Sequence, residues 1–173
     1  HLTRSRPEPD ANVEAGYASL QGNQFDTARR DYERALKADP NNVDALLALA
    51  AIAQSQGRSA DADRYRQRAI DADPRDPAAQ AASLGNSASG DPQANESRLK
   101  TLLASQPESG PLNFALGNLY SRQNRWSEAQ QVYFNAVAAD ADNPDYLFNL
   151  AVSLDHLRQP KLAAQHYRLA LEA

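Results

Sequence analysis

The stretch Ala28-Arg-Arg-Asp-Tyr32-Glu-Arg-Ala35-Leu-Lys-Ala-Asp-Pro40 decides the fold, because its spacing returns along the chain. The pattern Ala-x3-Tyr-x2-Ala recurs from Ala129 and Ala163, and a copy with arginine at the aromatic position starts at Ala62. The intervals from Ala28 to Ala62 and from Ala129 to Ala163 are equal. Since the interval between Ala62 and Ala129 falls one short of two such periods, we expect a degenerate copy, shorter by a single residue, between positions 77 and 109.

A pair of residues ending in a small one stands at the same distance before each opening alanine: Ala15-Gly16, Leu49-Ala50, Leu116-Gly117 and Leu150-Ala151. Two antiparallel helices approach closely only where the side chains at their crossing are small. The glycine or alanine that ends each pair and the opening alanine therefore predict facing notches on two helices of a hairpin. The tyrosine one helical turn after the alanine would fill the space beside them.

The period and the residue types together resemble the tetratricopeptide repeat (TPR), a helix–turn–helix motif of about 34 residues. The resemblance covers residues 9–173 and implies an all-α fold: an α-solenoid, or right-handed superhelix, of antiparallel helix pairs in about five repeats. After an extended lead-in at 1–8, the expected domain is a single array with repeats at 9–42, 43–76, 77–109 (degenerate), 110–143 and 144–173 (short).

The expected helices follow from this frame and from the turn residues. They are about 10–21, 26–38, 43–56, 60–72, 78–88, one starting at the N-cap Asp91, then 111–123, 127–139, 144–157 and 161–172. Gly57 is expected to close its helix with a left-handed cap. The helix at 78–88 carries one large apolar residue, Leu84, and Leu84-Gly85 could be its small-residue pair if this helix starts one residue late. The third repeat is thus either locally frayed or a hinge.

Composition and motifs argue against an enzyme. The chain has 173 residues, a net charge of −4, no cysteine and three histidines. Acidic and basic residues are mixed along the helices, so no basic stripe predicts nucleic-acid binding, and no apolar run is long enough to cross a bilayer. His156 and His166 have no carboxylate at metal-ligand spacing, and no phosphate loop or nucleophile motif is present. We expect no catalytic residues, no metal site and no cofactor.

The TPR resemblance implies that the first helix of each pair lines a concave groove that holds a partner. Read off once per period, the expected groove residues are Tyr17, Leu47, Ala51, Phe114, Asn118, Arg122, Phe148, Asn149, Val152 and His156. Phe114 and Phe148 are one period apart and are expected to stack as neighbouring rungs. Asn118 and Asn149 match positions where peptide-binding members carry asparagines that bond a ligand backbone, which an amide can do as donor and acceptor.

Two alternatives bear on this groove. The subset of the family that clamps a terminal carboxylate needs lysines where this chain has Val13, Phe114 and Phe148, so we do not expect that clamp. The groove instead suits an extended segment or an amphipathic helix. The other interpretation is structural: the phenylalanines pack between helices, and the asparagines satisfy local backbone.

The leading functional hypothesis is a non-enzymatic scaffold that binds a peptide or helix of a protein partner. The chain's Ala/Asp/Gln/Arg-rich composition looks bacterial, and the resemblance suggests an envelope assembly such as pilus biogenesis or secretion. The compartment stays open between cytoplasm and periplasm, with a membrane reached only through an anchor outside this sequence. One alternative is a self-association domain that forms a homo-oligomer through an uncapped last helix, where Tyr167 and Leu171 would be exposed. Another is the regulatory domain of an enzyme whose catalytic part lies elsewhere.

Overall fold

The computed structural model describes residues 12–13, 16, 24–84 and 91–173, and the regular secondary structure in this part of the chain is all α-helix. Its helices are α2 (Phe25–Ala38), α3 (Val43–Ser55), α4 (Ser59–Ala72), α5 (Pro77–Leu84), α6 (Pro92–Ser105), α7 (Gly110–Arg122), α8 (Trp126–Ala139), α9 (Pro144–His156) and α10 (Pro160–Glu172). Seven of them, α2 to α4 and α7 to α10, begin and end within one residue of their predicted ranges, and α6 begins directly after its predicted N-cap, Asp91. The predicted helix at 10–21 lies mostly outside the described residues.

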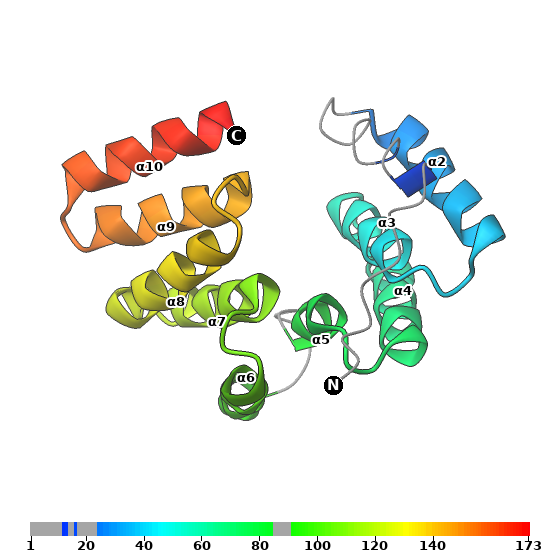
Figure 1. The fold of residues 1–173 in the computed structure, drawn as a ribbon, viewed down its shortest axis with the longest axis horizontal. Coiled ribbons are helices and arrows are strands. Elements are labelled where there is room, and N and C mark those ends of the chain that lie inside the picture. The colour runs from blue at the N-terminus through cyan, green and yellow to red at the C-terminus, as the bar shows by residue number, and fades with distance from the viewer. Residues whose placement is uncertain (1–11, 14–15, 17–23, 85–90) are drawn as a thin grey trace. The chain divides into compact units, whose positions relative to one another are not determined.

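The chain divides into two compact units, residues 1–79 and 80–173, with the boundary inside α5. The first unit holds α2, α3, α4 and the start of α5, and the second holds the end of α5 and helices α6 to α10 (Figure 1). Within the units, α3/α4, α7/α8 and α9/α10 are hairpins that pack closely along their lengths. The described chain is thus all-α and built from antiparallel helix pairs.

Side-chain N-caps start the first helix of each pair and fix the register. Asn42, Asp76, Ser109 and Asn143 accept hydrogen bonds from backbone N–H groups two or three residues ahead, at 2.9–3.2 Å. Such caps satisfy donors that have no partner inside the helix. The four caps keep the repeat period, except that the interval from Asp76 to Ser109 is shorter by a single residue.

The N-caps of the second helices locate the missing residue more closely. They are Gln24, Arg58, Asp91, Arg125 and Gln159, so the short interval falls between Arg58 and Asp91. Asp76 is still in step with Asn42, so the missing residue falls between Asp76 and Asp91, in the first half of the interval 77–109. With α5 starting at Pro77, Leu84 rather than Gly85 stands at the notch position of the third repeat, so the late-start register is wrong.

The predicted notches are filled by tyrosine rings in two repeats. A Cβ atom built on Gly117 would overlap Cε1 and Cδ1 of Tyr133, and one on Gly16 would lie 2.9 Å from the ring of Tyr32. Both rings are buried, and the facing Ala28 and Ala129 are fully buried. No side chain larger than hydrogen fits beneath these rings without displacing them.

Three tight turns between paired helices contain a residue with positive φ. Gly57 has φ 75°, as its predicted left-handed cap requires, and the matching positions are Asn124 (φ 57°) and Arg158 (φ 61°). Glycine adopts this conformation without steric cost, asparagine tolerates it, and arginine does not favour it. The turn geometry is therefore set by the helix pair, whichever residue occupies it.

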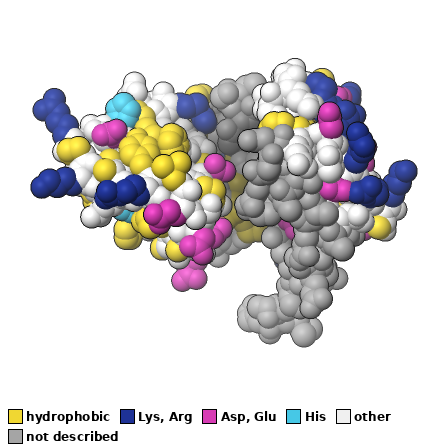
Figure 2. All heavy atoms as spheres, turned by 90° about the horizontal axis from the view of Figure 1, so that it is seen from above, with side chains coloured by type: hydrophobic (Ala, Val, Ile, Leu, Met, Phe, Trp, Pro, Cys, Tyr) yellow, Lys and Arg dark blue, Asp and Glu magenta, His cyan; other side chains and the backbone are white. Residues whose placement is uncertain are grey.

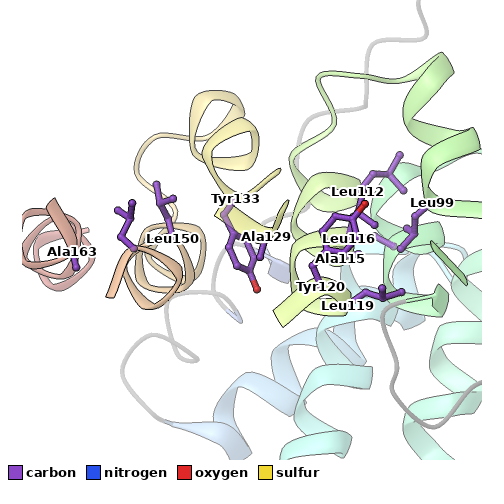
Figure 3. Close-up of a cluster of buried hydrophobic side chains, with 12 residues drawn as sticks. Leu99, Leu112, Ala115, Leu116, Leu119, Tyr120, Ala129, Tyr133, Leu150 and Ala163 are labelled. Carbon is purple, nitrogen blue, oxygen red and sulfur yellow. The ribbon is translucent and has the colours of Figure 1, made fainter. Parts of the chain in front are cut away.

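The core of the second unit is continuous through its helices. Figure 3 shows buried side chains in sequence from Leu99 on α6 through Leu116 on α7 and Tyr133 on α8 to Leu150 on α9 and Ala163 on α10. Ala81 and Leu84, at the end of α5, pack with this cluster. The first unit has two smaller clusters, one around Tyr32, Leu49 and Ile52 and one around Leu46, Ala69 and Ala79. The second unit thus provides a firm base for a surface site on α7 and α9.

Candidate functional site

A hollow of about 240 Å³ opens on the second unit where α7, α8 and α9 meet. Its walls are formed by Asn118, Ser121 and Arg122 of α7, Trp126 and Tyr133 of α8, and Asn149 and Val152 of α9. Four of the predicted groove residues, Asn118, Arg122, Asn149 and Val152, therefore line one site. Sites for drug-sized molecules are commonly about 300–1,000 Å³, so this one suits a few side chains of a longer segment.

A directed chain of hydrogen bonds runs along the wall of the hollow. The Tyr133 hydroxyl donates to Oδ1 of Asn118 at 2.7 Å and lies 2.9 Å from Oγ of Ser121. A phenol has one proton, so Ser121 must be the donor to Tyr133. With its oxygen occupied by Tyr133, the Asn118 amide presents its NH₂ group as a free donor.

The pKa of Tyr133 agrees with this arrangement. Burial raises the pKa of the phenol, because the low-dielectric surroundings disfavour the phenolate. The hydrogen bond from Ser121 and the positive charge of Arg122 act in the opposite direction. Arg122 therefore lies close enough to the hollow for its charge to be felt at the Tyr133 hydroxyl.

Trp126 is held in place by His156. The indole and imidazole rings are stacked with centroids 3.8 Å apart and an angle of 2° between their planes. His156 is the last residue of α9 and Trp126 the first of α8, so the stack joins the ends of two helices. His156 does not line the hollow itself, but it fixes one of its walls.

Arg122 and Asn149 offer unused polar groups. Arg122 is exposed and forms no ion pair within the part of the chain that the structure describes, whereas several other arginines are paired with carboxylates. The Asn149 amide is half-buried at the rim and likewise forms no hydrogen bond to any described residue. Both groups are available to a ligand.

The two predicted groove phenylalanines have different environments. Phe114 is half-buried between helices, with its ring 4.8 Å from Tyr146 and 5.8 Å from Tyr133. Phe148 is 51% exposed and meets the edge of Tyr167 at 5.4 Å. Both rings pack against tyrosine rings. The predicted stacking of Phe114 on Phe148 is not among the ring contacts between described residues. For Phe114 the structural interpretation accounts for the packing, while Phe148 remains on the surface.

The predicted groove residues of the first unit form no comparable site within the described residues. Leu47 is half-buried and packs against the cluster of Leu46, Ala69 and Ala79. Ala51 is exposed on α3, and Tyr17 lies outside the described residues. Among the predicted groove residues that the structure describes, those that line a common hollow are on α7 and α9.

Sequence reasoning missed Ser121, Trp126 and Tyr133 as walls of the site. The last turn of α7 and the first turn of α8 are separated by only a short turn, so their side chains converge. Trp126 is the single tryptophan and stands at that turn. Its position at the start of the second helix was the signal that could have identified it.

Exposed apolar side chains mark a second feature of this unit. Leu162, Leu169 and Leu171 of α10 are exposed, Leu171 to 87%. Figure 2 shows hydrophobic side chains gathered on the face of this unit, on the left of the view, beside lysine and arginine residues. Tyr167, expected to be exposed, is half-buried and lies 3.4 Å from a carboxylate oxygen of Asp155 through its hydroxyl.

Neither a metal cluster nor a membrane-spanning helix occurs in the described ranges. Residues 24–84 and 91–173, with 12, 13 and 16, contain no group of three His, Asp or Glu side chains placed to hold a metal ion. None of the helices described is long and apolar enough to cross a membrane.

The helix hairpins, their regular period and the hollow on successive first helices define a helical-repeat scaffold. The sequence profile of the Tetratricopeptide repeat family matches residues 19–83 and 87–154, and the chain belongs to this family. Its members are generally non-catalytic scaffolds for protein–protein interaction. No curated protein matches the sequence.

Solved structures with the same fold include three that cover most of this chain. TTC0263, a thermophilic TPR protein of Thermus thermophilus, is 22% identical with a TM-score of 0.70 over 93% of this chain and 89% of that one. PilW, described as a type IV pilus biogenesis factor, is 20% identical with a TM-score of 0.64 over 94% and 77%. PilF of Pseudomonas aeruginosa is 22% identical with a TM-score of 0.60 over 94% and 75%. At these identities the likeness establishes the fold alone.

Proposed function

We propose that the chain is a protein-interaction module that holds a segment of a partner protein across α7 and α9, anchored in the hollow. The observation that carries this proposal is the convergence of Asn118, Arg122, Asn149 and Val152 on one site. These residues come from the first helices of two consecutive repeats, and their polar groups are not all used by the fold.

The geometry suits an extended stretch of polypeptide. Asn118 and Asn149 lie on neighbouring first helices and line the same hollow, so one main chain can reach both amides. Val152 and the ring of Trp126 give apolar contact beside them. Main-chain bonds provide affinity whatever the ligand sequence, and the hollow selects a side chain.

The test is selection of peptides from a random display library by the immobilised chain. Asn118→Ala/Asn149→Ala should bind the selected peptides about tenfold or more weakly, because two hydrogen bonds of about 1 kcal/mol each are lost. Asn135→Ala, an exposed asparagine of α8 away from the hollow, is the matched control. Unchanged affinity in a folded double variant would refute binding at this site.

A finer proposal is that the partner belongs to a bacterial envelope assembly, such as pilus biogenesis or secretion machinery. Its support is the resemblance to arrays of that kind, including PilW with its described role in pilus biogenesis. Cross-linking in the source cells, followed by mass spectrometry, should give envelope proteins whose yield drops in the Asn118→Ala/Asn149→Ala variant. Partners confined to the cytosol would contradict it.

Self-association is a second candidate, favoured by the exposed Leu162, Leu169 and Leu171 of α10. Exposed apolar patches of this kind often mark protein contacts. Light scattering should then show a dimer that Leu169→Lys converts to a monomer. A monomer at high concentration in the unmodified chain would exclude it.

A further inference from the structure

Two polar groups that line the hollow on α7, α8 and α9, those of Asn118 and Arg122, act on a ligand as hydrogen-bond donors. The Asn118 amide has its oxygen occupied by Tyr133 and turns its NH₂ group outward. Arg122 adds a guanidinium, which can only donate. No aspartate or glutamate is among the residues that line this described site. A ligand group that accepts hydrogen bonds and carries negative charge is therefore the best match.

We infer that the hollow receives an aspartate or glutamate side chain of the bound partner segment, its carboxylate held by Arg122 and the Asn118 amide. This inference rests on the proposed function and names the side chain selected at that site. The unpaired guanidinium is complementary in charge to a carboxylate and matches its planar shape. Val152 and Trp126 cover the methylene groups of the same side chain.

A single carboxylate fits better than a more highly charged group. A phosphate carries close to two negative charges, and phosphopeptide sites are usually built from clusters of arginines. Here Arg122 is the one cation lining the described hollow. A volume of about 240 Å³ likewise limits the occupant to one or two side chains.

Tyr133 and Ser121 act as positioning residues for this specificity. The Ser121–Tyr133–Asn118 chain fixes which end of the amide faces the ligand. Without the Tyr133 hydroxyl the amide is free to turn and present its oxygen, which repels a carboxylate. Tyr133→Phe keeps the ring over Gly117, so it removes the orientation while leaving the packing.

The experiment uses the whole chain and peptides selected from a random display library. The selected set should be enriched in Asp or Glu at one position. For a synthetic peptide from that set, changing the acid to its amide should weaken binding about fivefold, the size expected of a partly exposed charge pair. For the Arg122→Ala variant, the same change in the peptide should weaken binding by less than about twofold. The Arg122→Glu variant should prefer peptides with lysine at that position. Arg168→Ala, on exposed α10, is the control and should retain the acid preference.

Tyr133→Phe provides a readout that stability alone would not change. Its preference for acid over amide should fall towards that of Arg122→Ala, while circular dichroism and the midpoint of urea unfolding show a folded chain. An unchanged preference would refute the positioning role.

The outcomes separate the two proposals. Selected peptides without an acidic position, whose binding still depends on Asn118 and Asn149, would overturn the carboxylate inference and leave the binding module standing. Tighter binding of phosphoserine than of glutamate at the same position would replace the carboxylate with a phosphate. If no selected peptide binds the unmodified chain more tightly than it binds the Asn118→Ala/Asn149→Ala variant, both the proposed binding module and the carboxylate inference are refuted.

Discussion

The helix pairs α3/α4 and α7/α8 are copies of one pattern, nearly two periods apart, yet they differ at their centres. In α7/α8 the notch is Gly117, and the ring of Tyr133 lies directly over it. In α3/α4 the same positions are Ala50 and Arg66. Arg66 is 13% exposed along its side chain and forms an ion pair with Asp63 at 2.5 Å. One pair has an aromatic ring over a glycine notch at its centre, and the other has an alanine and an arginine at the equivalent positions.

The difference extends to the surface above the notch. The positions of Asn118 and Arg122 in α7 correspond to Ala51 and Ser55 in α3, which cannot form the same bonds. Tyr133 supports Asn118 through its hydroxyl, whereas Arg66 pairs with Asp63. The packing pattern of a repeat and its binding chemistry therefore vary separately. Of these two pairs, only α7/α8 combines a rigid notch with polar residues above it.

Removing the two central side chains should give the largest contrast. Tyr133→Ala is expected to lower the free energy of unfolding by about 3–5 kcal/mol, because it leaves a ring-sized cavity over Gly117. Arg66→Ala should cost about 1 kcal/mol or less, since its partner Asp63 is mostly exposed. Urea unfolding followed by Trp126 fluorescence reports on the second unit, and circular dichroism reports on the whole chain. Equal losses would show that the two centres are equivalent after all.

Filling the glycine notch tests the same contact from the other side. Gly117→Ala should lower stability by about 1–3 kcal/mol, although alanine is the better helix former. In a Tyr133→Leu background the same substitution should be neutral or stabilising, because the ring atoms that it meets are gone. Ala50→Gly in α3 should lose about 1 kcal/mol from helix propensity alone. Lack of coupling between positions 117 and 133 in this double-mutant cycle would contradict the packing.

Substitutions at the positive-φ residues of the turns between paired helices should change stability according to the residue that each turn now has. Arg158→Gly is expected to stabilise the chain by about 1 kcal/mol, because arginine at φ 61° is strained and glycine is not. Asn124→Gly should gain less, since asparagine tolerates the left-handed region. Gly57→Ala should lose about 1 kcal/mol. Thermal unfolding of the three variants measures the order, and a destabilised Arg158→Gly would mean that its side chain contributes more than its backbone strain.

Much of this architecture could be predicted because it depends on repeated spacing. The repeat period placed the described helices, and pairing a small residue with an aromatic one identified Gly117 beneath Tyr133. Convergence of Asn118 and Asn149 was predictable for the same reason, since equivalent turns of successive first helices face the same side.

What could not be predicted depends on how particular side chains turn. No pattern in the sequence tells that Phe114 packs against Tyr146 while Phe148 stays exposed, because both have the same place in the period. The stack of Trp126 on His156 joins the ends of two helices from different repeats, and its geometry depends on their crossing. The positive φ of Arg158 could not be predicted, because arginine does not favour the left-handed conformation.

The smallest expected effect concerns an ion pair between α6 and the start of α8. Glu96 accepts hydrogen bonds from Lys100, at 3.0 Å, and from Arg125, whose guanidinium also pairs with Glu128 and lies 4.3 Å from the ring centre of Tyr120. These bonds, first that of Lys100, lower the pKa of Glu96 below its ordinary value. Because the pKa of Glu96 is lower in the folded chain, the unfolded chain binds a proton at this residue at a higher pH than the folded chain does. The contribution is therefore complete above the ordinary glutamate range, about pH 4–5, and is lost as the pH falls through and below it.

Glu96→Gln should accordingly lower stability at neutral pH by up to about 1 kcal/mol and flatten the fall in stability on the acid side. The loss should shrink in high salt, because the groups are partly exposed. Glu33→Gln is the control, since its ion pair with Arg29 lies within α2 and joins no two helices. Urea unfolding midpoints between about pH 3 and 7 give the comparison. If the unfolding midpoints of the two variants depend on pH in the same way, the ion pair between α6 and α8 stabilises the chain no more than a pair within one helix. The difference between the pairs α3/α4 and α7/α8 would then lie in their central side chains alone.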